Sequence, residues 1–245
     1  MDKLLYTAMT GARYLMSRQD TAAQNMAHAS TPGYRAQIDA LRSSPLPGAD
    51  ARVFAMNTTV GADFSPGPVQ HTGRDLDVAF AGRGWFAVLA PDGNEAYTRF
   101  GSFEVTAEGL LQTRTGLAVL DQGGGPIAIP PNSTVSVGAD GTISATANTG
   151  ARVTTPVARI KLASAEDTNM VRGADGLFRT RDGEPAAADP ALRVASQSLE
   201  GSNVNAVEAM VTMIAVARQF ELQMKMISSA EENARQADRL LAHNG

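Results

Sequence analysis

The chain has 245 residues, a formal net charge of −4, 23 glycines and no cysteine. A chain of this length has enough material for the hydrophobic core of one or two domains. Its acidic balance argues against nucleic-acid binding, which needs a basic surface, and the absence of cysteine excludes disulfides and thiolate metal sites.

Residues 1–34 begin with a predicted amphipathic helix. Its small and apolar residues alternate by three and four positions, which places them on one helix face. This stripe is interrupted by Gln19 and otherwise comprises Leu5, Ala8, Ala12, Leu15, Ala22, Met26 and Ala29. The helix is expected to end before Pro32 and Gly33, because proline pushes the preceding residue out of the helical region and glycine permits a turn.

Residues 35–74 are rich in proline, glycine, serine and alanine and have no sustained hydrophobic period. The segments 44–48 and 65–68 each contain two prolines, which is typical of extended or irregular chain. A loop of this length is uncommon inside a compact domain. We therefore expect an extended linker that runs along a surface or joins domains.

Residues 75–201 predict a β-domain of short strands. Alternating runs of apolar and polar residues occupy 78–80, 85–89, 96–99, 102–105 and 117–120. Asp-Gly and Glu-Gly sequences supply turns after several of these runs. Turns at intervals of roughly ten to fifteen residues favour antiparallel meanders in an irregular barrel or sandwich.

Residues 202–245 predict a second amphipathic helix, and Asn205 with Glu208 has the spacing of a capping box. Its stripe is interrupted by Glu231 and Asp238 and otherwise comprises Ala206, Met210, Met213, Ala217, Phe220, Met224, Ile227, Ala234 and Leu241. About forty residues make a helix roughly 60 Å long, which overhangs a β-domain of this size. The two stripes would pair with each other or with other copies, so assembly is the first function to test.

Candidate chemistry is sparse. His28, His71 and His243 are far apart in sequence and lack metal-ligand spacing. Asp75 and Asp77 would point to the same face of a strand, where they could chelate a cation or share a proton. The simpler interpretation is that they stabilise a turn after Gly73. We expect no catalytic, cofactor-binding or metal-binding residues and no enzyme activity.

Four motifs at the element boundaries carry a resemblance. They are NMAHASTPGY at 25–34, GRDLDVA at 73–79 with GRGWF at 82–86, YTRFGSF at 97–103, and LEGSNVN at 199–205. Together they resemble the signatures of flagellar axial proteins of the rod and hook, whereas residues 121–198 match weakly. The signature turns would then comprise Asn25, Thr31, Pro32, Gly33, Tyr34, Asp75, Leu76, Asp77, Gly84, Trp85, Phe86, Ser202 and Asn203.

The resemblance implies a structural subunit of the bacterial flagellar basal-body rod. Copies of the chain and other rod proteins would assemble into a helical tube that transmits torque across the periplasm. The resemblance also implies export through the flagellar type III apparatus, so we expect neither a cleavable signal peptide nor a membrane span. Residues 1–12 and the modest length are most similar to proximal rod members, and a distal rod or hook-type protein is the alternative.

The expected fold class is α+β. Long N- and C-terminal helices would pack as a coiled-coil-like tube layer, with a central antiparallel all-β domain. The corresponding domains are a terminal helical domain of 1–34 and 202–245 forming the inner tube, a linker of 35–74, and a β-domain of 75–201.

A remote alternative is a periplasmic carbohydrate-binding or hydrolytic β-domain protein, in which Trp85 and Tyr97 would hold a sugar. A glycosidase needs two carboxyl groups across a cleft, roughly 5 to 9.5 Å apart. Asp75 and Asp77 are expected side by side on one strand instead, which disfavours this alternative.

Overall fold

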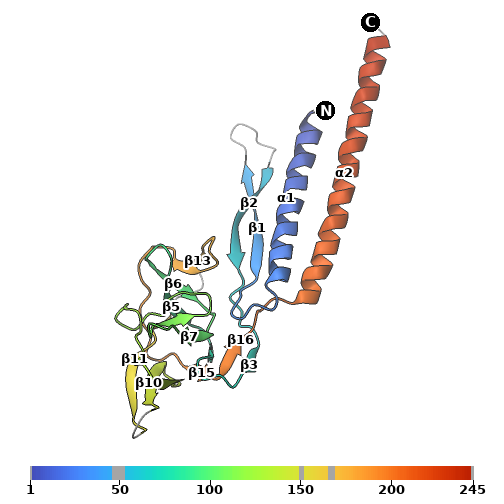
Figure 1. The fold of residues 1–245 in the computed structure, drawn as a ribbon. Coiled ribbons are helices and arrows are strands. Elements are labelled where there is room, and N and C mark those ends of the chain that lie inside the picture. The colour runs from blue at the N-terminus through green and yellow to red at the C-terminus, as the bar shows by residue number, and fades with distance from the viewer. Residues whose placement is uncertain (1, 46–52, 149–151, 165–168, 244–245) are drawn as a thin grey trace. The chain divides into compact units, whose positions relative to one another are not determined.

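The computed structural model divides the chain into two compact units. The backbone is described for residues 2–45, 53–148, 152–164 and 169–243, and side chains for 8–39, 61–148, 152–164, 169–233 and 235. The first unit, called the helical unit, comprises residues 1–29, 37–61 and 204–245, and the second, called the β-domain, comprises 30–36 and 62–203 (Figure 1). The sequence instead placed residues 30–34 with the helices and 35–74 in a linker.

The helical unit contains α1 (Asp2–Ala27), α2 (Ala206–His243) and the strand pair of β1 (Gln37–Pro45) and β2 (Val53–Ala62). α1 packs against both α2 and β1, and the two helices run in opposite directions (Figure 1). Asn205 caps α2, because its Oδ1 atom accepts hydrogen bonds from the backbone amides of Val207 (3.0 Å) and Glu208 (3.3 Å). The predicted helix cap is therefore confirmed.

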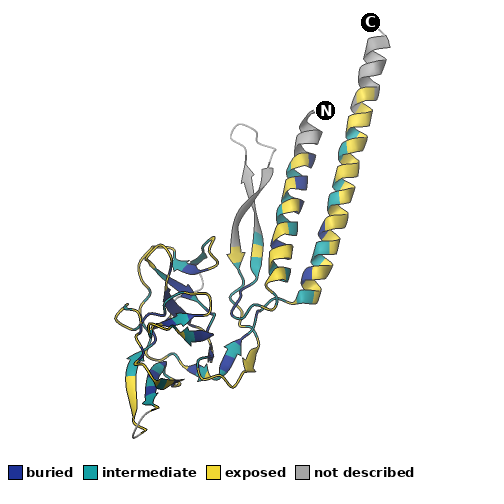
Figure 2. Ribbon diagram, viewed as in Figure 1, coloured by how far each residue is buried: buried dark blue, intermediate teal, exposed yellow. Residues whose placement is uncertain are grey.

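The expectation of long terminal helices packed as a coiled-coil-like tube layer is wrong. The described residues contain two helices, one near each end of the chain, with mostly antiparallel β-structure between them. α1 divides its contacts between α2 and β1, which a two-helix coiled coil would not do. Apolar residues also surround the first half of α2 and are not confined to its inward stripe, so most of them remain exposed (Figure 2).

The segment expected as an extended linker contains regular structure. β1 and β2 pair with each other, and β3 (Val69–His71) pairs with β16 (Ser198–Glu200). The residues of β2 include several β-branched and aromatic side chains, which favour strands. The prolines at 45, 66 and 68 therefore lie at or outside the ends of these strands, and Pro47 is outside the described residues.

The β-domain is built from short strands. Besides β3 and β16 it contains β4 (Val78–Phe80), β5 (Trp85–Leu89), β6 (Glu95–Thr98), β7 (Phe103–Val105), β8 (Leu111–Thr113), β9 (Ser133–Val137), β10 (Thr142–Ala147), β11 (Thr154–Arg159), β12 (Leu162–Ala163), β13 (Met170–Arg172), β14 (Phe178–Thr180) and β15 (Val194–Ser196). The larger sheets have the strand orders β12-β5-β6-β14-β13 and β11-β10-β9, and their pairs are antiparallel.

The core of the β-domain lies on both faces of β5. Phe86 packs into a cluster with Phe80 and Phe103, with ring centroids 4.4 and 5.2 Å from its own. Trp85 points to the opposite face, where its ring lies 4.6 Å from that of Phe178. Because successive side chains of a strand alternate between faces, a strand buried on both sides reads as the unbroken apolar run seen at 85–89.

Candidate functional site

The inner face of α1 is made of small residues and one leucine. Ala8, Ala12, Leu15 and Ala22 are buried, and Met26 is half-buried. The side chain of Gln223 on α2 donates a hydrogen bond from Nε2 to the backbone carbonyl of Ala8 (3.1 Å). Small side chains let the helices approach closely, so this face of α1 is largely covered within the chain. The side chain of Leu5 lies outside the described residues.

The face of α2 that is turned inward coincides only in part with the stripe expected at 206–241, because Ala209 and Val216 take the places of Met210 and Ala217. Ala209 and Val216 are buried, while Met213, Phe220 and Ile227 are partly buried. These residues follow one another by four, three, four and seven positions, so they form a single stripe. The side chains of Ala234, Asp238 and Leu241 lie outside the described residues.

Three expected members of the α2 stripe are exposed. Met210 and Met224 expose 48% and 46% of their surface, and Ala217 is also exposed. On the far side of the helix, Val207 (70%) and Ile214 (57%) are still more exposed. The helical unit therefore keeps unpaired apolar surface on α2, although not at every position that the sequence indicated.

A buried carboxylate joins distant segments of the β-domain. Glu200 Oε1 lies 2.8 Å from Arg35 Nη2, and Oε2 lies 3.1 Å from Arg99 Nε. All three side chains are at most 3% exposed. Glu200 Oε1 also accepts a hydrogen bond from the Gly67 amide (3.0 Å). One side chain thus connects the segment that follows α1, the end of β6, the segment before β3 and the strand β16.

The two arginines of this cluster also donate hydrogen bonds to backbone carbonyls. Arg35 Nη1 donates to Ser65 (2.6 Å), and Arg99 donates from Nη1 to Gly84 (2.7 Å) and from Nη2 to Gly82 (2.8 Å). Hydrogen bonds from charged groups to several loops fix those loops in place. The sequence reasoning quoted Arg99 and Glu200 within motifs but assigned them no role. Both residues are charged and stand close to a glycine of their motif, and this pattern could have indicated their role.

The turn at Gly33 has no room for a side chain. Gly33 has φ +70°, and a Cβ atom there would lie 2.5 Å from the backbone carbon of Arg99. Its amide donates to the Glu200 carbonyl (2.8 Å), and the Tyr34 amide donates to the Thr31 carbonyl (3.3 Å). Glycine is therefore required here both for its backbone conformation and for close approach. Pro32, the remaining residue of this turn, is partly exposed.

Asn203 connects the same segments through its amide. Its Oδ1 accepts a hydrogen bond from the Ala36 amide (2.7 Å), and its Nδ2 donates to the carbonyls of Asp63 (2.9 Å) and Ser65 (3.0 Å). The preceding residue, Ser202, is buried. The signature residues near both termini thus meet in one hydrogen-bonded junction of the β-domain.

In the helical unit, Asn25 plays a comparable part. Its side chain accepts a hydrogen bond from the Gln37 amide (2.8 Å) and donates one to the Gln37 carbonyl (2.9 Å). A side-chain amide that pairs with both backbone groups of one residue imitates a neighbouring strand. Asn25 therefore attaches the start of β1 to α1, with help from Thr21, whose hydroxyl donates to Asp39 (2.8 Å).

Asp75 and Asp77 have different partners. Asp77 is 1% exposed and accepts hydrogen bonds from the hydroxyls of Thr72 and Ser102, each at 2.8 Å, and from Arg74 Nη1 at 3.0 Å. Asp75 instead accepts a hydrogen bond from Gln197 Nε2 (2.7 Å). The two carboxylates therefore act as separate turn-stabilising groups.

The apolar members of the motif at 76–86 belong to the core. Leu76 packs against the Phe86 cluster, and Trp85 is 3% exposed. Gly84 has φ +144°, and a Cβ atom there would lie 2.6 Å from the Phe80 ring. Leu76, Gly84 and Trp85 are therefore needed for the packing of the core.

The remaining candidates are also placed by the structure. His28 follows α1 and His71 lies on β3, while the side chain of His243 is outside the described residues. Among the described side chains, no group of three His, Asp or Glu is arranged to hold a metal ion. None of the described helices is both long and apolar enough to cross a membrane.

The polar clusters of the β-domain are bonded internally, and the helices keep apolar surface exposed. This combination is typical of a structural protein that assembles with others. Comparison with known proteins supports this class. The model of the flagellar hook protein FlgE/F/G D1 domain matches residues 79–145, and that of the flagellar basal body rod FlgEFG protein C-terminal matches residues 195–240.

Full-length relatives define the family. Flagellar basal-body rod protein FlgF of Escherichia coli (strain K12) is 48% identical over 99% of both chains, and that of Salmonella typhimurium (strain LT2) is 46% identical over 99% of both. FlgF of Caulobacter vibrioides is 34% identical over 97% of both chains. The chain therefore belongs to the flagellar basal-body rod protein family. Within this family it is most like FlgF.

Proposed function

We propose that the chain is a structural subunit of the bacterial flagellar basal-body rod and lies in its proximal part. There it joins other copies and other rod proteins in a helical array that transmits torque across the periplasm. Its identity of 48% to a FlgF protein over 99% of both chains is the observation that carries this proposal.

The exposed apolar residues of α2 supply the means of assembly. Val207, Val211 and Ile214 expose 70%, 60% and 57% of their surface. Burying one such side chain against a neighbour contributes about 1.5–3 kcal/mol. Contacts between unlike surfaces that do not close into a ring generate a helical array, which is the geometry a rod requires. Assembly through α2 would then use Met210 and Met224 from the stripe proposed from the sequence, together with Val207, Val211 and Ile214.

The junction around Glu200 suits a subunit under torsional load. It is buried, and several segments of the chain are hydrogen-bonded to it. Tightly packed groups that are bonded to several segments resist sliding, so force that reaches one segment is shared with the others. We also propose that the chain is exported through the flagellar type III apparatus without a cleaved signal. In the rod, the helical unit would lie toward the axis.

Removal of residues 204–245 tests the role of α2. The full-length and shortened chains would be produced in a bacterium that lacks its own FlgF, and purified basal bodies would be probed for the chain. We expect only the full-length chain in basal bodies, while Trp85 fluorescence reports a folded β-domain in both. A shortened chain that still enters basal bodies would refute this role of α2.

A further inference from the structure

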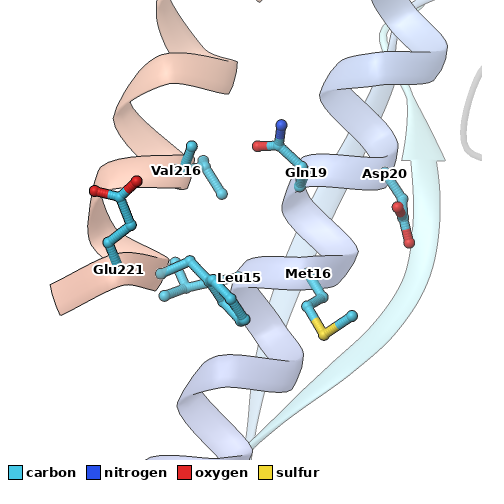
Figure 3. Close-up of a pocket in the computed structure, with 8 residues that line it drawn as sticks. Leu15, Met16, Gln19, Asp20, Val216 and Glu221 are labelled. Atoms are coloured by element: carbon cyan, nitrogen blue, oxygen red, sulfur yellow. The ribbon is translucent and has the colours of Figure 1, made fainter. Parts of the chain in front are cut away.

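The groove between α1 and α2 belongs to the helix contact already described. Leu15 and Gln19 of α1 point toward Val216 of α2 there, so the groove is lined by the inward faces of the two helices (Figure 3). The β-domain contains a feature that assembly through α2 leaves without a role. It is a short segment between β14 and β15, residues 184–188, which we call the strap.

Both ends of the strap are attached to strands of the five-stranded sheet. At its start, the hydroxyl of Thr180 on β14 donates a hydrogen bond to the Glu184 carbonyl (2.6 Å). At its end, Ala188 forms an antiparallel bridge with β12, and the amide of Asp189 donates to the Leu162 carbonyl of the same strand (2.8 Å). The strap therefore lies along the edge of this sheet, where β12 is the outermost strand.

The middle of the strap has little packing to hold it in place. Ala186 and Ala188 are half-buried, whereas Glu184, Pro185 and Ala187 are exposed. The side chains turned inward are thus alanines, and each offers a single methyl group to the sheet. Segments with few buried apolar contacts open locally more readily than the strands that they cover.

The hydroxyl of Tyr97 supplies a specific attachment for the strap. It accepts a hydrogen bond from the Ala186 amide (2.6 Å) and donates one to Glu95 Oε1 (2.7 Å). Glu95 is in turn paired with Lys161, whose Nζ lies 2.7 Å from Oε1 and 2.9 Å from Oε2. A tyrosine hydroxyl has one proton, so its donation to Glu95 leaves the lone pairs of the oxygen for the strap amide.

This chain of hydrogen bonds has a fixed direction. A carboxylate accepts a stronger hydrogen bond than a neutral group does, and hydrogen bonds in a chain polarise one another. Burial and the hydrogen bond to Glu95 also raise the pKa of Tyr97, so the hydroxyl keeps its proton in neutral solution. The Ala186 amide therefore meets an oriented acceptor.

We propose that Tyr97 is a latch that holds the strap closed, and that Glu95, itself held by Lys161, orients the hydroxyl of this latch. The strap opens locally while the strands beneath it stay folded. Its opening uncovers part of the aromatic cluster that contains Trp85 and Tyr97, against which Ala186 packs when the strap is closed. This conformational device lies within the β-domain and goes beyond the proposed rod function.

Hydrogen exchange of the full-length natural chain tests the local opening. Exchange would be followed by mass spectrometry with fragmentation to single residues, while urea is raised in steps that stay below the unfolding transition. We expect exchange of the Ala186 amide to change little with urea, because local opening exposes little surface. The amide of Phe103, which donates to the Leu76 carbonyl in the other core cluster, should exchange faster at each step. An equally steep response of both amides would overturn the proposal.

Tyr97→Phe tests the latch, because this substitution keeps the ring and removes the hydroxyl that accepts from Ala186. We expect exchange of the Ala186 amide to accelerate on the order of tenfold and to remain insensitive to urea. Tyr34→Phe removes a buried tyrosine hydroxyl elsewhere in the β-domain and is the matched control. It should leave the Ala186 rate unchanged even if it lowers overall stability. An unchanged rate in Tyr97→Phe, or equal acceleration in both variants, would refute the latch.

Glu95→Gln tests the orienting group, because glutamine keeps an acceptor oxygen but carries no charge. Alone, it should accelerate exchange of the Ala186 amide by a smaller factor than Tyr97→Phe does. Combined with Tyr97→Phe, it should add nothing to the Ala186 rate, since Glu95 acts on the strap through the hydroxyl. A further acceleration in the combined variant would contradict the orienting role of Glu95.

Discussion

Glu200 Oε1 lies 2.8 Å from Arg35 Nη2, and both side chains are at most 2% exposed. The residues are far apart in sequence, yet the ion pair joins the segment that leaves α1 to the strand that precedes α2. Removing one partner of a buried ion pair leaves an uncompensated charge, which destabilises a protein far more than loss of a surface pair. The stability of the β-domain should therefore depend strongly on this contact.

Glu200→Gln is expected to lower the free energy of unfolding of the β-domain by about 3–5 kcal/mol, because two buried guanidinium groups lose their counter-charge. Trp85 is the single tryptophan and is 3% exposed, so its fluorescence during urea unfolding reports on this domain. Glu184→Gln, at an exposed position, is the control and should change the free energy by less than about 0.5 kcal/mol. Equal effects of the two substitutions would show that the cluster is energetically unimportant.

Gly33→Ala should destabilise the β-domain more than Gly73→Ala. Both glycines have positive φ, +70° and +75°, so both substitutions incur the left-handed penalty of about 1–2 kcal/mol. A Cβ atom at Gly33 also lies 2.5 Å from the Arg99 backbone, whereas nothing lies within 4 Å of one at Gly73. Urea unfolding followed by Trp85 fluorescence measures the difference. A larger effect at Gly73 would be inconsistent with the packing described for the turn.

Asn25→Ala should loosen β1 from α1, because both hydrogen bonds to Gln37 are lost. Each such bond contributes about 0.5–1.5 kcal/mol, so hydrogen exchange of the Gln37 amide should accelerate on the order of tenfold. Asn25→Asp keeps the acceptor but loses the donor, and it should have an intermediate effect. Gln24→Ala, on the exposed side of α1, is the control. Unchanged exchange in Asn25→Ala would mean that β1 is held by other contacts.

Asp140 gives the β-domain a defined response to acid. Hydrogen bonds from the hydroxyl and amide of Thr142 hold the pKa of Asp140 below its ordinary value of 3.8. Since the folded-state pKa is the lower one, the contribution of Asp140 to stability is fully present above pH 3.8 and is lost as the pH falls through the folded-state pKa.

The difference between the unfolding midpoints of the natural chain and of Asp140→Asn, measured from pH 6 downward, should therefore be largest above pH 3.8 and shrink as the pH falls below it. The comparison with Asp140→Asn separates this group from other carboxylates that titrate in the same range. A difference that stayed constant across this range would contradict the assigned cause.

The positions of the helices could be predicted from the sequence, but the inward face of α2 could not be fixed with the same accuracy. Between Ala206 and Ala217 the sequence contains two polar residues, Glu208 and Thr212, so several faces are equally apolar. Tertiary contacts then select the face, here by the hydrogen bond from Gln223 to α1. The expected stripe includes the charged residues Glu231 and Asp238, which argues against it as the inward face. A stripe shifted by one position has alanines there, at 230 and 237.

The signature residues could be picked out in the sequence, but what they contact depends on long-range packing. Asn25 lies in α1, and Trp85 and Phe86 lie on β5, so these three are not turn residues. Gly33 and Asn203 are turn residues by composition, which is a local property. That Gly33 lies against Arg99, and that Asn203 bonds to the Ala36 amide, depends on how segments separated by many residues meet. Such contacts have no local signature. The strand pair of β1 and β2 was missed because its prolines were given more weight than the β-branched residues between them.

The most direct measurement of the rod assignment is electron cryo-microscopy of basal bodies from an Escherichia coli strain that lacks its own FlgF and produces this chain. We predict complete rods in which the density accommodates α1, α2 and the β-domain of this chain. Basal bodies that lack the chain, although it is produced and its Trp85 fluorescence shows a folded β-domain, would contradict its assignment as a rod subunit.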